Sequence, residues 1–142
     1  MNGYNREYNI EKGKVRVEKV KRKYESRGYK VTVYPISEHE IIDAIAENDT
    51  EVIALEITNW NKNGKLKMGK MKGWKRHWNK VKDDMKRKGD KRRFIKRLIY
   101  NYPDNIEFML KYLKSEKVEL EEWGYEDYPE EERFKIRGRN RL

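Results

Sequence analysis

Two carboxylates, Asp43 in EIIDAI and Glu56 in ALEIT, each accompany an apolar run of this 142-residue chain. Val52 to Leu55 are aliphatic and predict a strand buried on both faces, so an ionised Glu56 beside them needs a cation or a hydrogen-bond network. A short Asn-Asp-Thr segment separates the two runs and predicts a hairpin, across which Asp43 and Glu56 lie close together. Converging carboxylates repel each other, and a hard divalent cation relieves that repulsion. The pair therefore predicts a Mg²⁺ or Mn²⁺ site that can activate water for attack on a phosphodiester.

A purely structural interpretation of these acids stays open. Either carboxylate can pair with a Lys or Arg across the sheet, or lie at a strand edge that reaches water. For one such residue alone this is the better interpretation, whereas the two together favour the metal site. The histidines, His39 and His77, are far apart in sequence and predict no metal site of their own. Each is expected to be an ordinary surface residue, with a supporting role beside the Asp43 strand as the alternative for His39.

Hydrophobic periodicity predicts the elements that position the pair. The predicted elements are a helix at about 10–26 ended by Gly28, strands at 29–35, 40–47 and 51–60, a helix at 66–87, a strand at 93–103, a helix at 104–116 capped by Asp104, and a short strand at 117–125. The core order, α-β-β-β-α-β, indicates an α/β fold with one mixed sheet flanked by helices. Residues 1–125 are expected to form a single domain, and residues 126–142 an acidic and then basic tail with loose order.

Positive charge is concentrated in one third of the chain. Residues 65–97 contain sixteen Lys or Arg against three Asp, a net charge of +13, which exceeds the +10 of the whole protein. Such a concentration is typical of a surface that binds a polyanion, while the alternative is a solvated helix that keeps the protein soluble. We favour nucleic acid because the segment also contains aromatic residues, although Trp74 and Trp78 themselves are expected in the core. The residues expected to contact phosphates are Lys72, Lys75, Arg76, Lys80, Lys82, Arg87, Lys88, Lys91, Arg92 and Arg93.

The composition excludes several classes of protein. No run of about 18 apolar residues exists, so no membrane span is expected, and the first residues do not read as a secretory signal. The absence of Cys removes disulfides and thiolate chemistry and fits a cytoplasmic, intracellular protein. The chain also lacks Gln and is rich in Lys, Glu and Tyr, as hyperthermophile proteins are, whereas its eleven Asn residues argue against such a source.

Residues 10–60 resemble the archaeal Holliday junction resolvases of the PD-(D/E)XK nuclease superfamily. That family opens with a Lys-Gly pair, which Lys12 and Gly13 match, and then has a helix that carries a glutamate. Gly28 and Tyr29 match its step from helix to first strand. An aspartate on the second strand and a glutamate on the third follow in the family, and the two acids described above match them in type and spacing.

The resemblance implies a restriction-endonuclease-like fold and a magnesium-dependent endodeoxyribonuclease that acts on branched DNA, Holliday junctions included. It implies that Asp43 and Glu56 hold the metal, with the carbonyl of Ile57 completing the shell. It also implies a homodimer that cuts two opposed strands.

The sequence departs from the family pattern at two positions. The lysine of the E-x-K motif is replaced by Thr58, which would hydrogen-bond the attacking water, while Lys67 or Lys70 of the following helix would replace the missing amine. The helix glutamate is displaced by one residue, since Val17 occupies its position and Glu18 follows; Glu18 would then bind a second metal or a water. Two other functions stay open: a binding protein on the same fold that has lost catalysis, and an RNA-directed nuclease.

Overall fold

The helices and strands follow the predicted order. The computed structural model describes residues 6–34, 41–58, 68–101 and 107–128, together with residues 130 and 133. Its elements are α1 (Arg6–Ser26), β1 (Lys30–Val33), β2 (Ala44–Glu47), β3 (Glu51–Ile57), α2 (Met68–Arg87), β4 (Arg93–Tyr100), α3 (Glu107–Ser115), β5 (Glu119–Glu122) and a 3-10 turn, η2 (Tyr125–Asp127). Helix α1 begins four residues earlier than predicted, and Gly28, with a φ of 94°, follows its end as expected. The proposed cap Asp104 lies outside the described residues.

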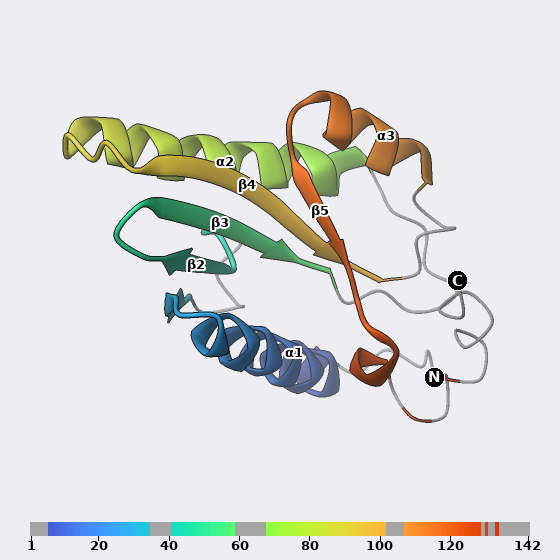
Figure 1. Cartoon of the computed structure of the whole chain (residues 1–142). Coiled ribbons are helices and arrows are strands. Elements are labelled where there is room, and N and C mark those ends of the chain that lie inside the picture. The colour runs from blue at the N-terminus through green and yellow to red at the C-terminus, as the bar shows by residue number, and fades with distance from the viewer. Residues whose placement is uncertain are drawn as a thin grey trace.

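The five strands form one mixed sheet in the order β1-β2-β3-β4-β5 (Figure 1). Strands β1, β2 and β3 are antiparallel neighbours joined by short connections, while β3, β4 and β5 run parallel. A parallel connection needs a crossover, and α2 and α3 supply the two that the sheet requires. The α/β class and the mixed sheet flanked by helices are therefore confirmed.

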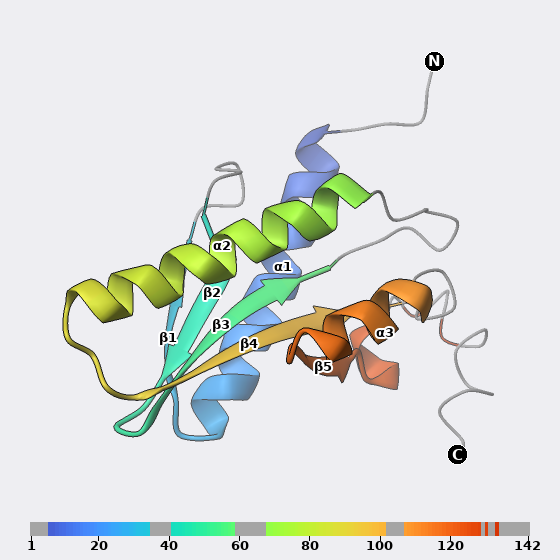
Figure 2. The same ribbon diagram turned by 90° about the horizontal axis from the view of Figure 1, so that it is seen from above.

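Helices cover both faces of the sheet (Figures 1 and 2). Val20 and Tyr24 of α1 pack on one face, together with the side chains of Ile53 and Leu55. Helices α2 and α3 cover the other face, where Val52 and Ala54 contribute the strand side of the core. Because successive side chains of β3 alternate between two buried faces, its apolar run is continuous. Any acid on the Val52 and Ala54 face therefore points towards α2.

The hairpin turn fixes the register of β2 against β3. The Asn48 side-chain oxygen accepts the backbone N–H groups of Thr50 at 3.0 Å and Glu51 at 2.9 Å. The Asn48 N–H in turn donates to the Glu51 carbonyl at 3.0 Å. An Asn that bonds the backbone two and three residues ahead stabilises a tight reversal, and a shift of one residue would move every buried side chain to the opposite face.

The ordered domain extends past the predicted boundary at residue 125. Tyr128 is 1% exposed, and its ring centroid lies 5.2 Å from that of Trp123. Arg16 of α1 lies over the Trp123 ring and forms an ion pair with Asp127 at 3.1 Å. The predicted boundary therefore falls too early, because an aromatic side chain after it completes the core beneath α1.

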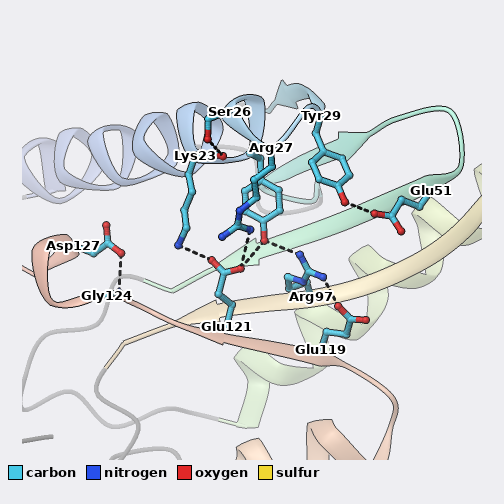
Figure 3. Close-up of polar contacts among 11 residues, drawn as sticks. Lys23, Ser26, Arg27, Tyr29, Glu51, Arg97, Glu119, Glu121, Gly124 and Asp127 are labelled. Atoms are coloured by element: carbon cyan, nitrogen blue, oxygen red, sulfur yellow. Dashed lines mark hydrogen bonds and ion pairs between the residues drawn. The ribbon is translucent and has the colours of Figure 1, made fainter. Parts of the chain in front are cut away.

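A polar network joins α1 to β4 and β5 on the α1 face (Figure 3). The Tyr24 hydroxyl donates to Glu121 Oε1 and accepts from Arg97, each at 2.9 Å. Lys23 holds the second oxygen of Glu121 at 3.0 Å, and Arg97 also pairs with Glu119. The acidic edge strand β5 is thus neutralised by basic residues from its neighbours, and the Tyr24 hydroxyl is the buried link between them.

Tyr24 should titrate far above an ordinary tyrosine. Burial is the main cause that raises the pKa of Tyr24 to about 12, whereas an exposed phenol has a pKa of about 10. The folded state then keeps a proton that the unfolded state releases, so this hydroxyl's contribution to stability is complete below pH 10 and is lost as the pH rises towards 12. Tyrosinate absorbance at alkaline pH should show a component near pH 12 that Tyr24→Phe removes, and an unchanged curve in that variant would contradict the assignment.

Candidate functional site

Asp43 and Glu56 lie directly opposite each other at the open end of the hairpin. Ala44 is the register partner of Leu55, so the next pair outward joins Asp43 to Glu56. Glu56 follows Val52 and Ala54 on the α2 face of β3 and is 3% exposed. The predicted convergence of the two acids is therefore confirmed.

A backbone hydrogen bond holds the Asp43 carboxyl group beside Glu56. The backbone N–H of Ile57 donates to Asp43 Oδ2 at 2.8 Å. The Asp43 and Glu56 side chains are close enough for each to affect the pKa of the other. Among the residues that the structure describes, neither acid forms an ion pair with a Lys or Arg, and each acid has the other as a neighbour.

His77 of α2 provides a further contact to the pair. Its Nδ1 lies 2.9 Å from Glu56 Oε1, and the two side chains are 11% and 4% exposed. The prediction that His77 is an ordinary surface residue is wrong. Three residues after Trp74 and four before Val81, it continues the buried stripe of α2, and that spacing was the signal available in the sequence. His39 lies outside the described residues.

Burial makes both carboxyl groups hard to ionise. It is the main cause that raises the pKa of Asp43, and also the main cause that raises the pKa of Glu56 well above its ordinary value. The charge of Asp43 is the second cause for Glu56, as expected for two acids that share one site. The pair therefore retains a proton at pH values where exposed acids have lost theirs, and a cation bound between them would replace that proton.

Lys70 lies near both acids. Its positive charge lowers the pKa of Asp43 and of Glu56, in each case against the larger effect of burial. The Lys70 side chain is exposed in the first turn of α2. Gly73 and His77, three and seven residues later, lie on the same side of the helix. Of the two predicted replacement lysines, Lys70 is close enough for its charge to act on both acids, while Lys67 lies outside the described residues.

Thr58 has a structural contact rather than an open hydroxyl. It is 4% exposed and donates its hydroxyl proton to Asn101 Oδ1 at 3.0 Å. The Thr58 hydroxyl oxygen in turn accepts the Asn101 backbone N–H at 3.2 Å, and the Thr58 backbone N–H donates to the Ile99 carbonyl at 2.8 Å. The expected bond from Thr58 to an attacking water is therefore disfavoured, because its one proton already joins the ends of β3 and β4. Asn101 had not been identified from the sequence.

Glu18 is not brought to the carboxyl pair. It is exposed on α1, which packs on the face of the sheet opposite to α2. Val17, the residue at the family position, is 5% exposed and belongs to the core. Since a step of one residue turns the helix by about 100°, the burial of Val17 sends Glu18 towards solvent. The expected metal-binding role of Glu18 is therefore not supported.

The pair suits a hard divalent cation. In the described part of the chain, no group of three or more Asp, Glu or His residues is placed to hold a metal. Magnesium does not need such a group, because it is commonly held by one or two carboxylates together with waters and phosphate oxygens. Asp43 and Glu56 offer two adjacent carboxylates whose ionisation is opposed by burial, and this donor set fits Mg²⁺ or Mn²⁺.

The outer face of α2 carries most of the predicted phosphate contacts. The predicted phosphate contacts that are exposed on this helix and the turn after it are Lys72, Arg76, Lys80, Lys82, Arg87, Lys88 and Lys91. The surface of α2 formed by Lys72, Arg76 and Lys80 is called the basic face below. Its three side chains are exposed, on the side of α2 opposite to the buried Trp74 and Trp78, so they are open to a ligand.

Four of the predicted contacts have partners within the protein. Lys75 bonds the Tyr112 hydroxyl at 3.0 Å and pairs with Glu116 at 3.1 Å. Arg92 is held by Asp90 at 2.7 Å and Glu47 at 3.0 Å, and so connects the turn before β4 to the hairpin. The other two, Arg87 and Arg93, are well exposed but pair with Asp84 and Glu119. Lys75 and Arg92 therefore have structural roles.

Comparisons with known proteins identify no relative, so a function has to be argued from the residues of the site. Within the ranges that the structure describes, no helix is long and apolar enough to cross a membrane. No protein-family model matches the sequence, and no curated protein matches it.

Proposed function

We propose that the protein is a Mg²⁺- or Mn²⁺-dependent endodeoxyribonuclease that acts on branched DNA from a restriction-endonuclease-like scaffold. The observation that carries the proposal is the buried contact between Asp43 and Glu56 on the α2 face of the hairpin. Support comes from the element order, from the resemblance of residues 10–60 to junction resolvases, and from the basic face on the helix that covers the same side of the sheet.

Each residue of the site has a separate task in this proposal. Asp43 and Glu56 would hold the cation, with the Ile57 carbonyl beside them. When bound, the cation supplies Lewis acidity and a water of lowered pKa. Lys70 would stabilise negative charge that develops on the phosphate, because its positive charge already acts on both carboxyl groups. Ile57 fixes Asp43 through its own N–H, so the geometry of the pair is set by the backbone of β3.

The basic face would position the DNA backbone. Lys and Arg side chains that contact phosphates fix orientation and register but do not read bases. Selectivity would then come from the shape of a branched substrate rather than from its sequence. A homodimer with one site in each subunit would cut two opposed strands of a junction.

A cleavage assay tests the proposal directly. Four-way DNA junctions, linear DNA duplex and RNA of the same sequence are incubated with the protein in Mg²⁺, Mn²⁺ or EDTA. The expected result is cleavage of the junction in either cation and none in EDTA. Junction binding without cutting in any cation would contradict the nuclease assignment, and preferential cutting of RNA would contradict the substrate class.

A binding protein without catalysis is the second candidate. The observation that favours it is Thr58, which stands at the position of the family's lysine and has its hydroxyl proton committed to Asn101. Such a protein would bind junctions equally well in EDTA. Dissociation constants with and without cation, measured beside the cleavage assay, separate the two candidates.

The triple variant Lys72→Ala, Arg76→Ala, Lys80→Ala should weaken DNA binding and its dependence on salt. The slope of log K against log salt is negative, and each lost phosphate contact makes it shallower by about 0.9. The three substitutions together should therefore reduce its magnitude by about 2 to 3. Fluorescence anisotropy with labelled junction between about 50 and 200 mM salt measures the slope.

The matched control removes three exposed basic residues from elsewhere. Lys19 and Arg22 lie on α1, across the sheet from the basic face, and Lys30 lies on β1. The variant with Ala at all three has the same net charge as the α2 variant, yet its salt slope should change by less than about 1. Equal losses in both triple variants would mean that overall charge, and not the basic face, governs binding.

A further inference from the structure

His77 and its neighbour Trp78 join α2 to β3 at two points. The Trp78 indole N–H donates to the Ala54 carbonyl at 3.0 Å in the core. His77 contacts Glu56, two residues further along the same strand, at 2.9 Å. Because Trp78 fixes how α2 is rotated and where it lies along β3, the position of the His77 imidazole is set independently of Glu56.

The contact also restricts the Glu56 carboxylate. With a cation bound, Glu56 would be ionised and its carboxylate would accept hydrogen bonds only, so Nδ1 of His77 would be the donor to Oε1. The side chain of His77 is 11% exposed and that of Glu56 is 4% exposed, so bulk water competes little for this bond. The same carboxyl group contacts Asp43 across the hairpin. Glu56 is therefore held from the helix on one side and faces its partner acid on the other.

We infer that His77 is a positioning residue, which holds the Glu56 carboxylate in the orientation needed to share a divalent cation with Asp43. The inference rests on the proposed metal-dependent function. It adds a residue that the resemblance to junction resolvases did not suggest. Hydrogen bonds from a second residue to a metal-binding carboxylate preserve its geometry, and their loss typically weakens metal binding by about 10- to 100-fold.

Three substitutions separate this role from simple packing. His77→Asn keeps an N–H donor near the position of Nδ1, His77→Gln places its donor nearer to Nε2, and His77→Ala has none. We expect His77→Ala to raise the Kd for Mn²⁺ by about 10- to 100-fold, His77→Gln to resemble it, and His77→Asn to remain within about threefold of the unsubstituted protein. Mn²⁺ binding is measured by electron paramagnetic resonance in the absence of DNA, so the result does not depend on catalysis.

A neighbouring residue supplies the control. Asn79 is exposed on α2, two residues after His77, and Asn79→Ala should leave the Kd for Mn²⁺ unchanged. Urea unfolding of each variant shows whether the fold is retained, and if His77→Ala fails to fold, the comparison of the Asn and Gln variants decides.

The outcomes distinguish this inference from the proposed function. If the unsubstituted protein binds no Mn²⁺, the proposed function fails, and the role of His77 fails with it. If the protein binds Mn²⁺ and the Asn and Gln variants bind it equally well, only the role of His77 is overturned. Weaker binding in the Gln variant and recovery in the Asn variant would support it.

Discussion

Replacing Glu56 with Gln should abolish cation-dependent cleavage and, at the same time, stabilise the cation-free protein. The amide keeps the shape of the carboxyl group but cannot supply a charged oxygen to a cation, so the rate of junction cleavage should fall by about 10³-fold or more. DNA affinity should change little, because Glu56 is 3% exposed and turned towards Asp43 rather than the basic face. Single-turnover cleavage and anisotropy measure the two effects.

The gain in stability follows from the raised pKa of Glu56. The folded protein retains a proton on this residue at pH values where the unfolded chain has released it, because burial opposes ionisation. The contribution of Glu56 to stability is therefore complete below about pH 4 and is lost as the pH rises towards the raised folded pKa. Glu56→Gln removes this loss, so the variant should exceed the original protein in free energy of unfolding at pH 8.

Urea unfolding in EDTA at pH 5 and pH 8 measures that gain, which should be larger at pH 8. Glu18→Gln is the matched control, since Glu18 is exposed on α1 and should alter neither cleavage nor stability by a measurable amount. Adding Mg²⁺ should stabilise the original protein but not the Glu56 variant. Full cleavage by Glu56→Gln would overturn the assignment of the site.

The hairpin explains why the sequence predicted the carboxyl pair. Contacts between adjacent strands follow from two local quantities, the length of the turn and the alternation of apolar residues, and both are visible in the sequence. Asn48 marks the turn, and the buried run up to Leu55 marks the strand, so the pairing of Asp43 with Glu56 follows by counting outward from the turn. The order of helices and strands was predictable for the same reason.

Contacts between distant elements could not be counted in this way. His77 reaches Glu56 only because α2 returns across the sheet at one particular rotation, which Trp78 fixes through a tertiary hydrogen bond. Likewise Arg92 meets Glu47 from 45 residues away, although its neighbours in the sequence suggested a phosphate contact. Charge patterns show how many basic residues a segment has, but their individual partners depend on the packed structure.

The position of Thr58 gives a physical reason for a lysine to come from α2. Residue 58 is 4% exposed, and its hydroxyl exchanges hydrogen bonds with Asn101 at the ends of β3 and β4. A lysine there would have to place a charged amine in a buried site, and an unpaired buried charge costs several kcal/mol. Lys70 instead keeps its amine exposed and still acts on both carboxyl groups.

Lys70→Ala should therefore lower the rate of junction cleavage by about 10²- to 10³-fold, the usual effect of removing one group that stabilises transition-state charge. Unlike Glu56→Gln, it should leave Mn²⁺ binding unchanged or tighter, because the lost positive charge opposed the cation. Lys70→Arg should recover part of the rate, since it keeps the charge but not the compact ammonium group. Lys80→Ala, on the basic face of α2, is the control and should cleave at nearly the original rate at saturating DNA. If Lys67→Ala abolishes cleavage while Lys70→Ala does not, the amine comes from the segment before α2, and Lys70 acts only on the ionisation of the pair.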